Sequence, residues 1–338
     1  MKAVSIHEHG GLDVLQVDNI PKPEPGPGQV RIHLKTSALN HLDIWVRNGF
    51  PGIPLPMILG SDGAGHICTV GENVSRFKAD DEVLVQPLVY CGECRNCQAG
   101  NENMCATMGI LGESTNGTNC EFIVLDEKCV EPKPENISFA EAAAFPLVAQ
   151  TAYQMLVKRA NVQPGENVLV WGAGSGVGHM AVQIAKIAGC NVIATAGTDE
   201  KCNYARELGA DLVVHHYNDD VAGEVITFCG KVDVVFEHVG SATWDVSMKV
   251  LKNGGRVVTC GATTGANVAI DLRHLFFKQQ SVLGSTMGDA DSFMQVIKLV
   301  EEGQLKPRID KIFSLDDIAI AHEYLENSEQ FGKVVITI

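Results

Sequence analysis

The chain has 338 residues, 45% of them apolar and 20% charged, so it is long enough for two domains with sizeable hydrophobic cores. Its formal net charge of −15 argues against nucleic acid or an anionic membrane as a partner, because either would favour a basic face. No stretch approaches the roughly 20 apolar residues that span a bilayer, and no signal segment precedes the first strand. We therefore expect a cytoplasmic protein that acts on a small molecule.

The first region, from Met1 to about Pro132, consists of short alternating apolar runs separated by Gly and Pro. The runs at 30–34, 80–85 and 121–125 are examples, and their length and spacing are typical of β-strands. Many short strands in series predict an antiparallel, barrel-like domain.

A cysteine cluster interrupts this region at 91–105. Its four members follow a C-x2-C-x2-C-x7-C spacing: Cys91, Cys94, Cys97 and Cys105. Four thiolates complete a tetrahedral zinc site and leave no position for water or substrate, so the spacing predicts a structural zinc lobe. The other seven cysteines are scattered among apolar neighbours, and we interpret them as small buried residues because the total of 11 is odd and no secretory signal is present.

The second region alternates strands with helices. A helical pattern at 139–157 is followed by strands at 167–171, 191–195, 212–214, 232–236, 256–260 and 281–283 and by a helix at 177–188. This alternation predicts an α/β fold with a doubly wound parallel sheet. Helices at 293–302 and 318–326 and a final strand at 333–338 complete the chain. We predict a first domain at 1–140, a second at 141–285 and a terminal segment at 286–338 that returns to the first.

A glycine-rich turn lies between the first strand and the first helix of the second region. A dinucleotide pyrophosphate needs such a turn, because small residues let it approach backbone N–H groups at a helix N-terminus. The residues expected to bind it are Gly172, Gly174, Ser175, Gly176 and Val177. In this strand–turn–helix context the motif predicts a nicotinamide dinucleotide site.

The next strand ends without a carboxylate that could hold an adenosine 2′-hydroxyl. Gly197 and Thr198 stand there instead, and Lys201 follows, where it could pair with a 2′-phosphate. NADP(H) is therefore favoured over NAD(H). The alternative is that Lys201 is solvated, and the nearby Asp199 and Glu200 weaken the phosphate interpretation.

Several motifs in order resemble those of the medium-chain dehydrogenase/reductases, the superfamily of zinc alcohol dehydrogenases and quinone oxidoreductases. They are the start Met1–Val4, the four-cysteine lobe, the glycine turn and the closing Gly332–Ile336, so the resemblance covers nearly the full length. It implies a GroES-like β-barrel catalytic domain, a Rossmann domain and an active-site cleft between them. It also implies a homodimer or homotetramer paired through the strand near 280–284.

The resemblance also implies a catalytic zinc held by two cysteines and a histidine. This chain has Asn40, Ser61 and Leu147 at those positions, and these side chains cannot together replace thiolates and imidazole. His41, Asp62 and His66 are the other possible ligands nearby, but a catalytic zinc needs three ligands in one geometry. The Asn40-x-x-Asp43 pattern instead is similar to that of the zinc-free quinone oxidoreductases.

The substituted ligands favour hydride addition to an activated C=C bond, because nothing here would offset the alkoxide charge of an isolated carbonyl. The leading hypothesis is thus NADPH-dependent reduction of a quinone, an enone or an enoyl-CoA in a zinc-free active site. A zinc-containing alcohol dehydrogenase or aldehyde reductase is the alternative, and a non-catalytic NADPH-binding protein is the third.

The resemblance places the nicotinamide between Thr151 and the turn at Gly261 and Ala262. Asn40, Asp43 and Asp62 are the candidates for positioning substrate or cofactor, although loop capping explains them equally well. A partly apolar pocket is expected from side chains such as Trp45, Phe50, Tyr90, Phe277 and Met287.

Overall fold

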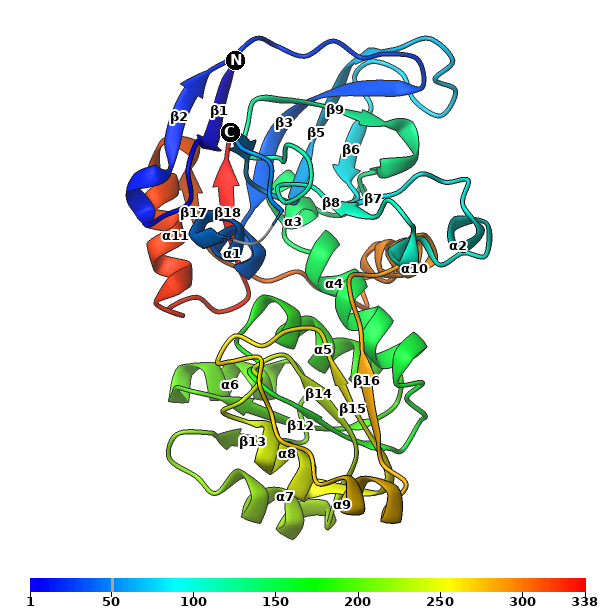
Figure 1. Ribbon diagram of the computed structural model, residues 1–338, viewed down its shortest axis with the longest axis vertical. Helices are drawn as coiled ribbons and strands as arrows, with labels where there is room; N and C mark the ends of the chain where they lie inside the picture. Colours follow the sequence, from blue (N-terminus) through cyan, green and yellow to red (C-terminus); the bar gives the residue numbers. More distant parts are fainter. Residues whose placement is uncertain (50–51) are drawn as a thin grey trace. The chain divides into compact units, whose positions relative to one another are not determined.

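The computed structural model describes residues 1–49 and 52–338, which form two compact units. Unit 1 contains residues 1–147 and 289–338, and unit 2 contains residues 148–288. Both ends of the chain therefore lie in unit 1 (Figure 1). Unit 2 is inserted between the two parts of unit 1.

Unit 1 is built on a seven-stranded sheet. Its order is β10 (Val130–Pro132), β6 (Glu82–Val85), β5 (Asp62–Val70), β3 (Gln29–Ala38), β18 (Lys333–Thr337) and β17 (Ile309–Ser314), and β9 (Phe122–Asp126) also pairs with β3. Val30, Ile32 and Leu34 alternate along β3 and are buried, as the period of two predicts. They pack in one hydrophobic core with Ile67 and Val83 of the neighbouring strands.

Two smaller sheets complete the strands of unit 1. One has the order β2 (Gln16–Asn19), β1 (Lys2–Ile6) and β4 (Met57–Ile58), and the other pairs β7 (Leu88–Val89) with β8 (Gly109–Ile110). The α-helices of this unit are α1 (His41–Gly49), α2 (Arg95–Gln98), α3 (Phe139–Ala143), α10 (Ala290–Glu301) and α11 (Ile318–Glu326).

The helical pattern predicted at 139–157 forms separate elements. α3 is closed at its start by a capping box between Ser138 and Glu141 and ends at Ala143. α4 (Pro146–Tyr153) then begins on a proline and continues into a π-helix at Gln154–Arg159. Proline suits the first position of a helix because its missing N–H would have no partner there, which explains the break.

Unit 2 is a six-stranded parallel sheet, so the predicted doubly wound fold is confirmed. Its order is β13 (Leu212–His215), β12 (Asn191–Ala196), β11 (Asn167–Val170), β14 (Val232–Glu237), β15 (Leu251–Thr259) and β16 (Ser281–Gly284). Numbered along the chain, this is the 3-2-1-4-5-6 order of dinucleotide-binding sheets.

Helices cover both faces of this sheet. They are α5 (Gly176–Ile187), α6 (Asp199–Glu207), α7 (Val221–Cys229), α8 (Trp244–Val250) and α9 (Leu272–Phe277). Figure 1 shows α5 on one side of the sheet and α7 and α8 on the other. Every residue of the central strand β14 is buried, as expected for a parallel strand covered on both faces. Within the described residues, no helix combines the length and the apolar character needed to cross a membrane.

Candidate functional site

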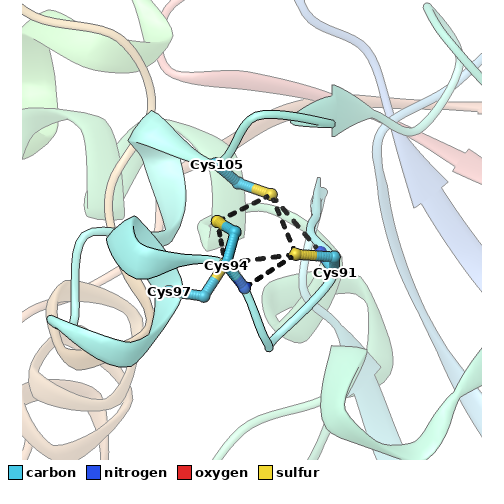
Figure 2. Close-up of side chains that lie close together, drawn as sticks. All are labelled: Cys91, Cys94, Cys97 and Cys105. Atoms are coloured by element: carbon cyan, nitrogen blue, oxygen red, sulfur yellow. Dashed lines mark hydrogen bonds between the residues drawn. The ribbon is translucent and has the colours of Figure 1, made fainter.

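The four cysteines of the predicted zinc lobe come together in unit 1 (Figure 2). Their sulfur atoms lie within 4.8 Å of one another, and four of the Sγ–Sγ distances are 3.5, 3.6, 3.9 and 3.9 Å. A tetrahedral zinc with Zn–S bonds of about 2.3 Å needs sulfurs roughly 3.8 Å apart. The lobe is therefore a four-cysteine structural zinc site, as predicted.

The backbone of the lobe prepares these sulfurs to carry negative charge. The amide N–H of Cys91 donates to Cys105 Sγ at 3.4 Å, and this bond is the main cause that lowers the pKa of Cys105 to about 6. The N–H of Cys94 donates in turn to Cys91 Sγ at 3.3 Å. Burial acts the other way at Cys97 and raises the pKa of its thiol to about 12, so this sulfur ionises readily only against a metal cation.

The glycine turn in unit 2 connects β11 to α5. Gly172 has a φ of +59°, and a Cβ on Gly178 would lie 2.2 Å from the Gly172 carbonyl oxygen, so both positions require glycine. Ser175 caps α5 by accepting from the Gly178 N–H at 2.9 Å. The predicted residues Gly174, Gly176 and Val177 complete this turn. It leaves the N-terminus of a 12-residue helix at the carboxyl end of the sheet, where a pyrophosphate is favoured.

One side chain at this turn was missed by the sequence analysis. His238 follows β14, and its Nε2 lies 2.8 Å from the Trp171 carbonyl oxygen, so we assign the proton to Nε2. Burial lowers the pKa of His238, which keeps the ring neutral. A Cβ on Gly261 would lie 3.0 Å from the His238 carbonyl, so the predicted turn at Gly261 and Ala262 adjoins the glycine turn.

A pair of residues near the end of β12, His216 and Tyr217, was also missed by the sequence analysis. A Cβ on Gly197 would lie 2.8 Å from the ring of Tyr217 and 2.9 Å from His216 Nε2. The predicted Thr198 caps α6 by accepting from the Lys201 N–H at 3.2 Å. Burial is the main cause that lowers the pKa of His216, and the positive charge of Lys201 makes a smaller contribution in the same direction. His216 and Tyr217 lie outside the glycine-rich sequence motif, so only the fold brings them close to Gly197.

Two of the candidate positioning residues, Asn40 and Asp62, lie together in unit 1 with a third residue, Lys333. Asn40 precedes α1, and its Nδ2 donates to Asp62 Oδ2 at 2.9 Å. Lys333, the first residue of β18, donates from Nζ to Asn40 Oδ1 at 2.6 Å and to Asp62 Oδ2 at 2.9 Å. Their exposed fractions are 6% for Asn40, 0% for Asp62 and 2% for Lys333. We call Asn40, Asp62 and Lys333 the Asp62 cluster.

Asp43 lies beside this cluster and holds two loops together. Its Oδ2 accepts from the Asn40 N–H at 2.7 Å, which closes the start of α1, and its Oδ1 accepts from the Gly60 N–H at 2.8 Å. Burial raises the pKa of Asp43 to about 6, although both N–H bonds oppose this shift. These contacts account for Asp43 as a loop-capping residue.

The residues at the expected catalytic-zinc positions do not fit that metal. Asn40 is engaged in the Asp62 cluster, and Ser61 donates its hydroxyl to the Leu111 carbonyl at 2.8 Å. The side chain of Leu147 is apolar, and its backbone N–H donates to Asp62 Oδ1 at 2.8 Å. Among residues 1–49 and 52–338, the cysteine lobe is the only cluster of at least three His, Cys, Asp or Glu ligands. His66 packs against the Phe139 ring instead, at 4.8 Å.

The remaining candidates are placed as follows. Thr151 is nearly buried on α4, and Met287 is also buried. Trp45 is half-buried on α1, Tyr90 lies beside Lys128 near the zinc lobe, and the side chain of Phe277 is 83% exposed on α9. Phe50 lies outside the described residues.

Two protein families match the chain, one in each region. Residues 26–135 match the alcohol dehydrogenase GroES-like domain, and residues 176–302 match the zinc-binding dehydrogenase domain. A crystal structure of an NAD-dependent alcohol dehydrogenase is 44% identical, covers 100% of both chains and superposes with a TM-score of 0.97. The chain belongs to the zinc-type alcohol dehydrogenase family. The resemblance found in the sequence and the GroES-like and Rossmann folds are thereby confirmed, and the protein is an oxidoreductase.

Two curated relatives are also informative. The NAD-dependent alcohol dehydrogenase of Sulfolobus acidocaldarius is 32% identical over 100% of both chains. The crotonyl-CoA carboxylase/reductase of Cereibacter sphaeroides is 29% identical over 99% of this chain and 86% of its own. The first of these two relatives is the more identical and matches this chain end to end.

These comparisons correct the predicted reaction. The chain was expected to reduce a quinone, an enone or an enoyl-CoA in a zinc-free active site, and its similarity to alcohol dehydrogenases contradicts that expectation. The error came from giving three substituted positions more weight than the four-cysteine lobe and the full-length pattern. The alternative, a zinc-containing alcohol dehydrogenase or aldehyde reductase, is better supported.

Proposed function

We propose that this protein is a nicotinamide-dependent alcohol dehydrogenase that interconverts an alcohol and its aldehyde or ketone. The observation that carries the proposal is the 44% identity to an NAD-dependent alcohol dehydrogenase over the whole of both chains. The six-stranded sheet with its glycine turn and the four-cysteine zinc lobe agree with it.

The residues of unit 2 fit a dinucleotide. The N-terminus of α5 and the backbone of the glycine turn would hold the pyrophosphate, since a side chain at Gly172 or Gly178 would block its approach. The neutral His238 fixes the turn through the Trp171 carbonyl. When bound, the nicotinamide supplies or accepts the hydride.

The adenosine end favours NADP(H), although the alcohol dehydrogenase relatives are named as NAD-dependent. Gly197 follows β12 at the position where an acidic residue would hold a 2′-hydroxyl, and the cation of Lys201 lies near His216. Asp199 and Glu200, the nearest carboxylates on α6, are both exposed. A 2′-phosphate would therefore meet a cation and N–H groups rather than a carboxylate.

Replacing Lys201 by Ala tests this preference. We expect kcat/KM for NADPH to fall about tenfold and kcat/KM for NADH to change by less than twofold. A tenfold fall corresponds to the lower end of the free energy of a charge-assisted hydrogen bond. Arg206→Ala removes another cation from α6 and serves as the matched control. Equal losses with both cofactors would remove the 2′-phosphate role of Lys201.

The reaction itself is tested with the zinc-loaded protein on matched panels of substrates. Primary and secondary alcohols are offered with NAD⁺ or NADP⁺, and the corresponding aldehydes and ketones with NADH or NADPH, while absorbance at 340 nm is followed. We expect turnover in both directions with at least one alcohol–carbonyl pair. Turnover of quinones or enones with none of any alcohol or saturated carbonyl would contradict the proposal.

We also propose a homodimer or homotetramer. β16 is the edge strand of the unit 2 sheet, and α9 just before it exposes large apolar side chains, with Leu272 67%, Phe276 70% and Phe277 83% exposed. An open strand edge beside an apolar patch favours pairing with a second copy. Light scattering on the eluted protein would give the mass of the assembly, and a monomer would contradict this proposal.

A further inference from the structure

A buried carboxylate, that of Glu237, lies at the carboxyl end of β14 in unit 2. Its Oε1 accepts from the backbone N–H groups of Val239 and Gly240, at 2.7 and 3.1 Å. Its Oε2 accepts from the hydroxyls of Thr243 and Ser247, at 2.8 and 2.9 Å. Each oxygen therefore has two donors, which fills the acceptor capacity of a carboxylate. The turn after β14 and the helix α8 are thereby bonded to one side chain.

The same carboxylate is connected to the residue that precedes the glycine turn. The indole N–H of Trp171 donates to Ser247 Oγ at 2.8 Å, and Ser247 in turn donates to Glu237. His238, the next residue after Glu237, donates from Nε2 to the Trp171 carbonyl oxygen at 2.8 Å. Two adjacent residues at the end of β14 thus hold Trp171 by its indole and by its backbone. These bonds fix the position from which the glycine turn begins at Gly172.

The turn after β15 joins the same network. The carbonyl oxygen of Val239 accepts from the N–H and from the hydroxyl of Thr264, both at 2.8 Å. Since Thr264 follows β15, the carboxyl ends of β11, β14 and β15 are linked around Glu237. These three strands are neighbours in the sheet, and parallel sheets of this order bind dinucleotides at the carboxyl ends of their strands.

We propose that Glu237 is a positioning residue for the dinucleotide, which holds the glycine turn and the turns after β14 and β15 in the arrangement that binds the cofactor. This inference rests on the proposed nicotinamide-dependent function. Glu237 is 0% exposed and both of its oxygens are occupied, so it acts through the three turns and not by contact with the cofactor. Turns that are ordered before the cofactor binds reduce the entropy lost on binding.

A matched control lies near the opposite end of β14. Asp233 is also a buried carboxylate, 5% exposed, and its Oδ2 accepts from the Asn167 N–H at 3.0 Å while the side chain pairs with Lys252. Asn167 is the first residue of β11. Asp233 therefore joins the same two strands as Glu237, but at their amino ends, away from the edge that binds dinucleotides.

The test compares Glu237→Gln with Asp233→Asn. The amide of Gln can still accept from the two backbone N–H groups, but its NH2 group would compete with the Trp171 indole for Ser247, which weakens the link to the glycine turn. We expect the Kd for the nucleotide that the protein binds, NADH or NADPH, to rise about tenfold in Glu237→Gln. KM for that cofactor should rise similarly, and kcat at saturating cofactor should stay within about twofold.

Titrations followed by nicotinamide fluorescence give the Kd, and calorimetry gives the Tm. Asp233→Asn should lower the Tm, because it also removes a buried charge from its partners, but should leave the Kd within about twofold of the wild type. Ser247→Ala is a second variant that removes only the hydroxyl between Trp171 and Glu237, and it should raise the Kd about threefold.

The role of Glu237 would be overturned by a wild-type Kd in Glu237→Gln or by an equal rise of the Kd in Asp233→Asn. If Glu237→Gln does not fold, a wild-type Kd in Ser247→Ala would overturn it. Failure of the proposed function is seen separately, because the unmodified protein would then bind neither NADH nor NADPH.

Discussion

The zinc lobe and the Asp62 cluster are both polar sites of unit 1, but they are built from opposite kinds of sequence information. The four cysteines lie within 15 residues, from 91 to 105, and their spacing alone identifies the site. Lys333 is 271 residues from Asp62 and 293 from Asn40, and it joins them only because β18 returns to pair with β3. A local site can be read from spacing, whereas a site closed by a distant strand requires the fold.

The largest expected effect removes the local site. Cys94→Ser should release the zinc, because three thiolates and a hydroxyl bind it far more weakly, and metal binding contributes about 10–16 kcal/mol to folding in small zinc domains. Plasma mass spectrometry would show the loss of zinc, and calorimetry would show a lower Tm. Cys229→Ser, on α7, is the control and should keep both. A Cys94→Ser protein with full zinc content and wild-type Tm would show that the lobe does not hold the metal.

The next effect breaks the distant site. Lys333→Met leaves the fully buried Asp62 carboxylate without its cation, which should cost about 3–5 kcal/mol of unfolding free energy in urea. The double variant Lys333→Met/Asp62→Asn removes both charges and should recover most of that loss. If the single variant were as stable as the wild type, Asp62 would not depend on Lys333.

A second cluster, Arg47, His322 and Glu326, also joins residues that are far apart in the sequence, and its effect on stability depends on pH. Arg47 donates to His322 Nδ1 at 3.2 Å and pairs with Glu326, and burial together with the Arg47 charge lowers the pKa of His322 to about 3. A histidine with a depressed folded pKa contributes stability above its unfolded pKa of about 6.5 and loses it as the pH falls toward 3. At pH 5 the loss should be about 2 kcal/mol relative to pH 7.5.

Urea unfolding at the two pH values measures this loss. His322→Asn cannot titrate, so it should lose about 2 kcal/mol less than the wild type between pH 7.5 and pH 5. His274→Asn, at an exposed position on α9, should behave like the wild type. An identical pH dependence in His322→Asn and the wild type would show that His322 is not the group responsible.

The same contrast explains what could be predicted from the sequence. The alternation of strands and helices predicted the parallel sheet, and local rules identified the zinc lobe and the glycine turn. Residues brought in by distant strands were missed: His238 from the end of β14, His216 and Tyr217 after β13, and Lys333 from β18. The predicted reaction failed for a related reason. The prediction depended on Asn40, Ser61 and Leu147 as failed metal ligands. It left out the cation of Lys333, which lies 271 residues beyond Asp62 and 293 beyond Asn40 in the chain.

The most direct test of the account is transfer of hydrogen from an alcohol to the nicotinamide. The purified protein would be incubated with an alcohol deuterated at its hydroxyl-bearing carbon and with NAD⁺ or NADP⁺, and the reduced cofactor analysed by mass spectrometry and NMR. The account predicts one deuterium at C4 of the nicotinamide, on a single face, together with the matching aldehyde or ketone. A reduced cofactor without deuterium, or no reduced cofactor from any alcohol, would contradict the assignment as an alcohol dehydrogenase.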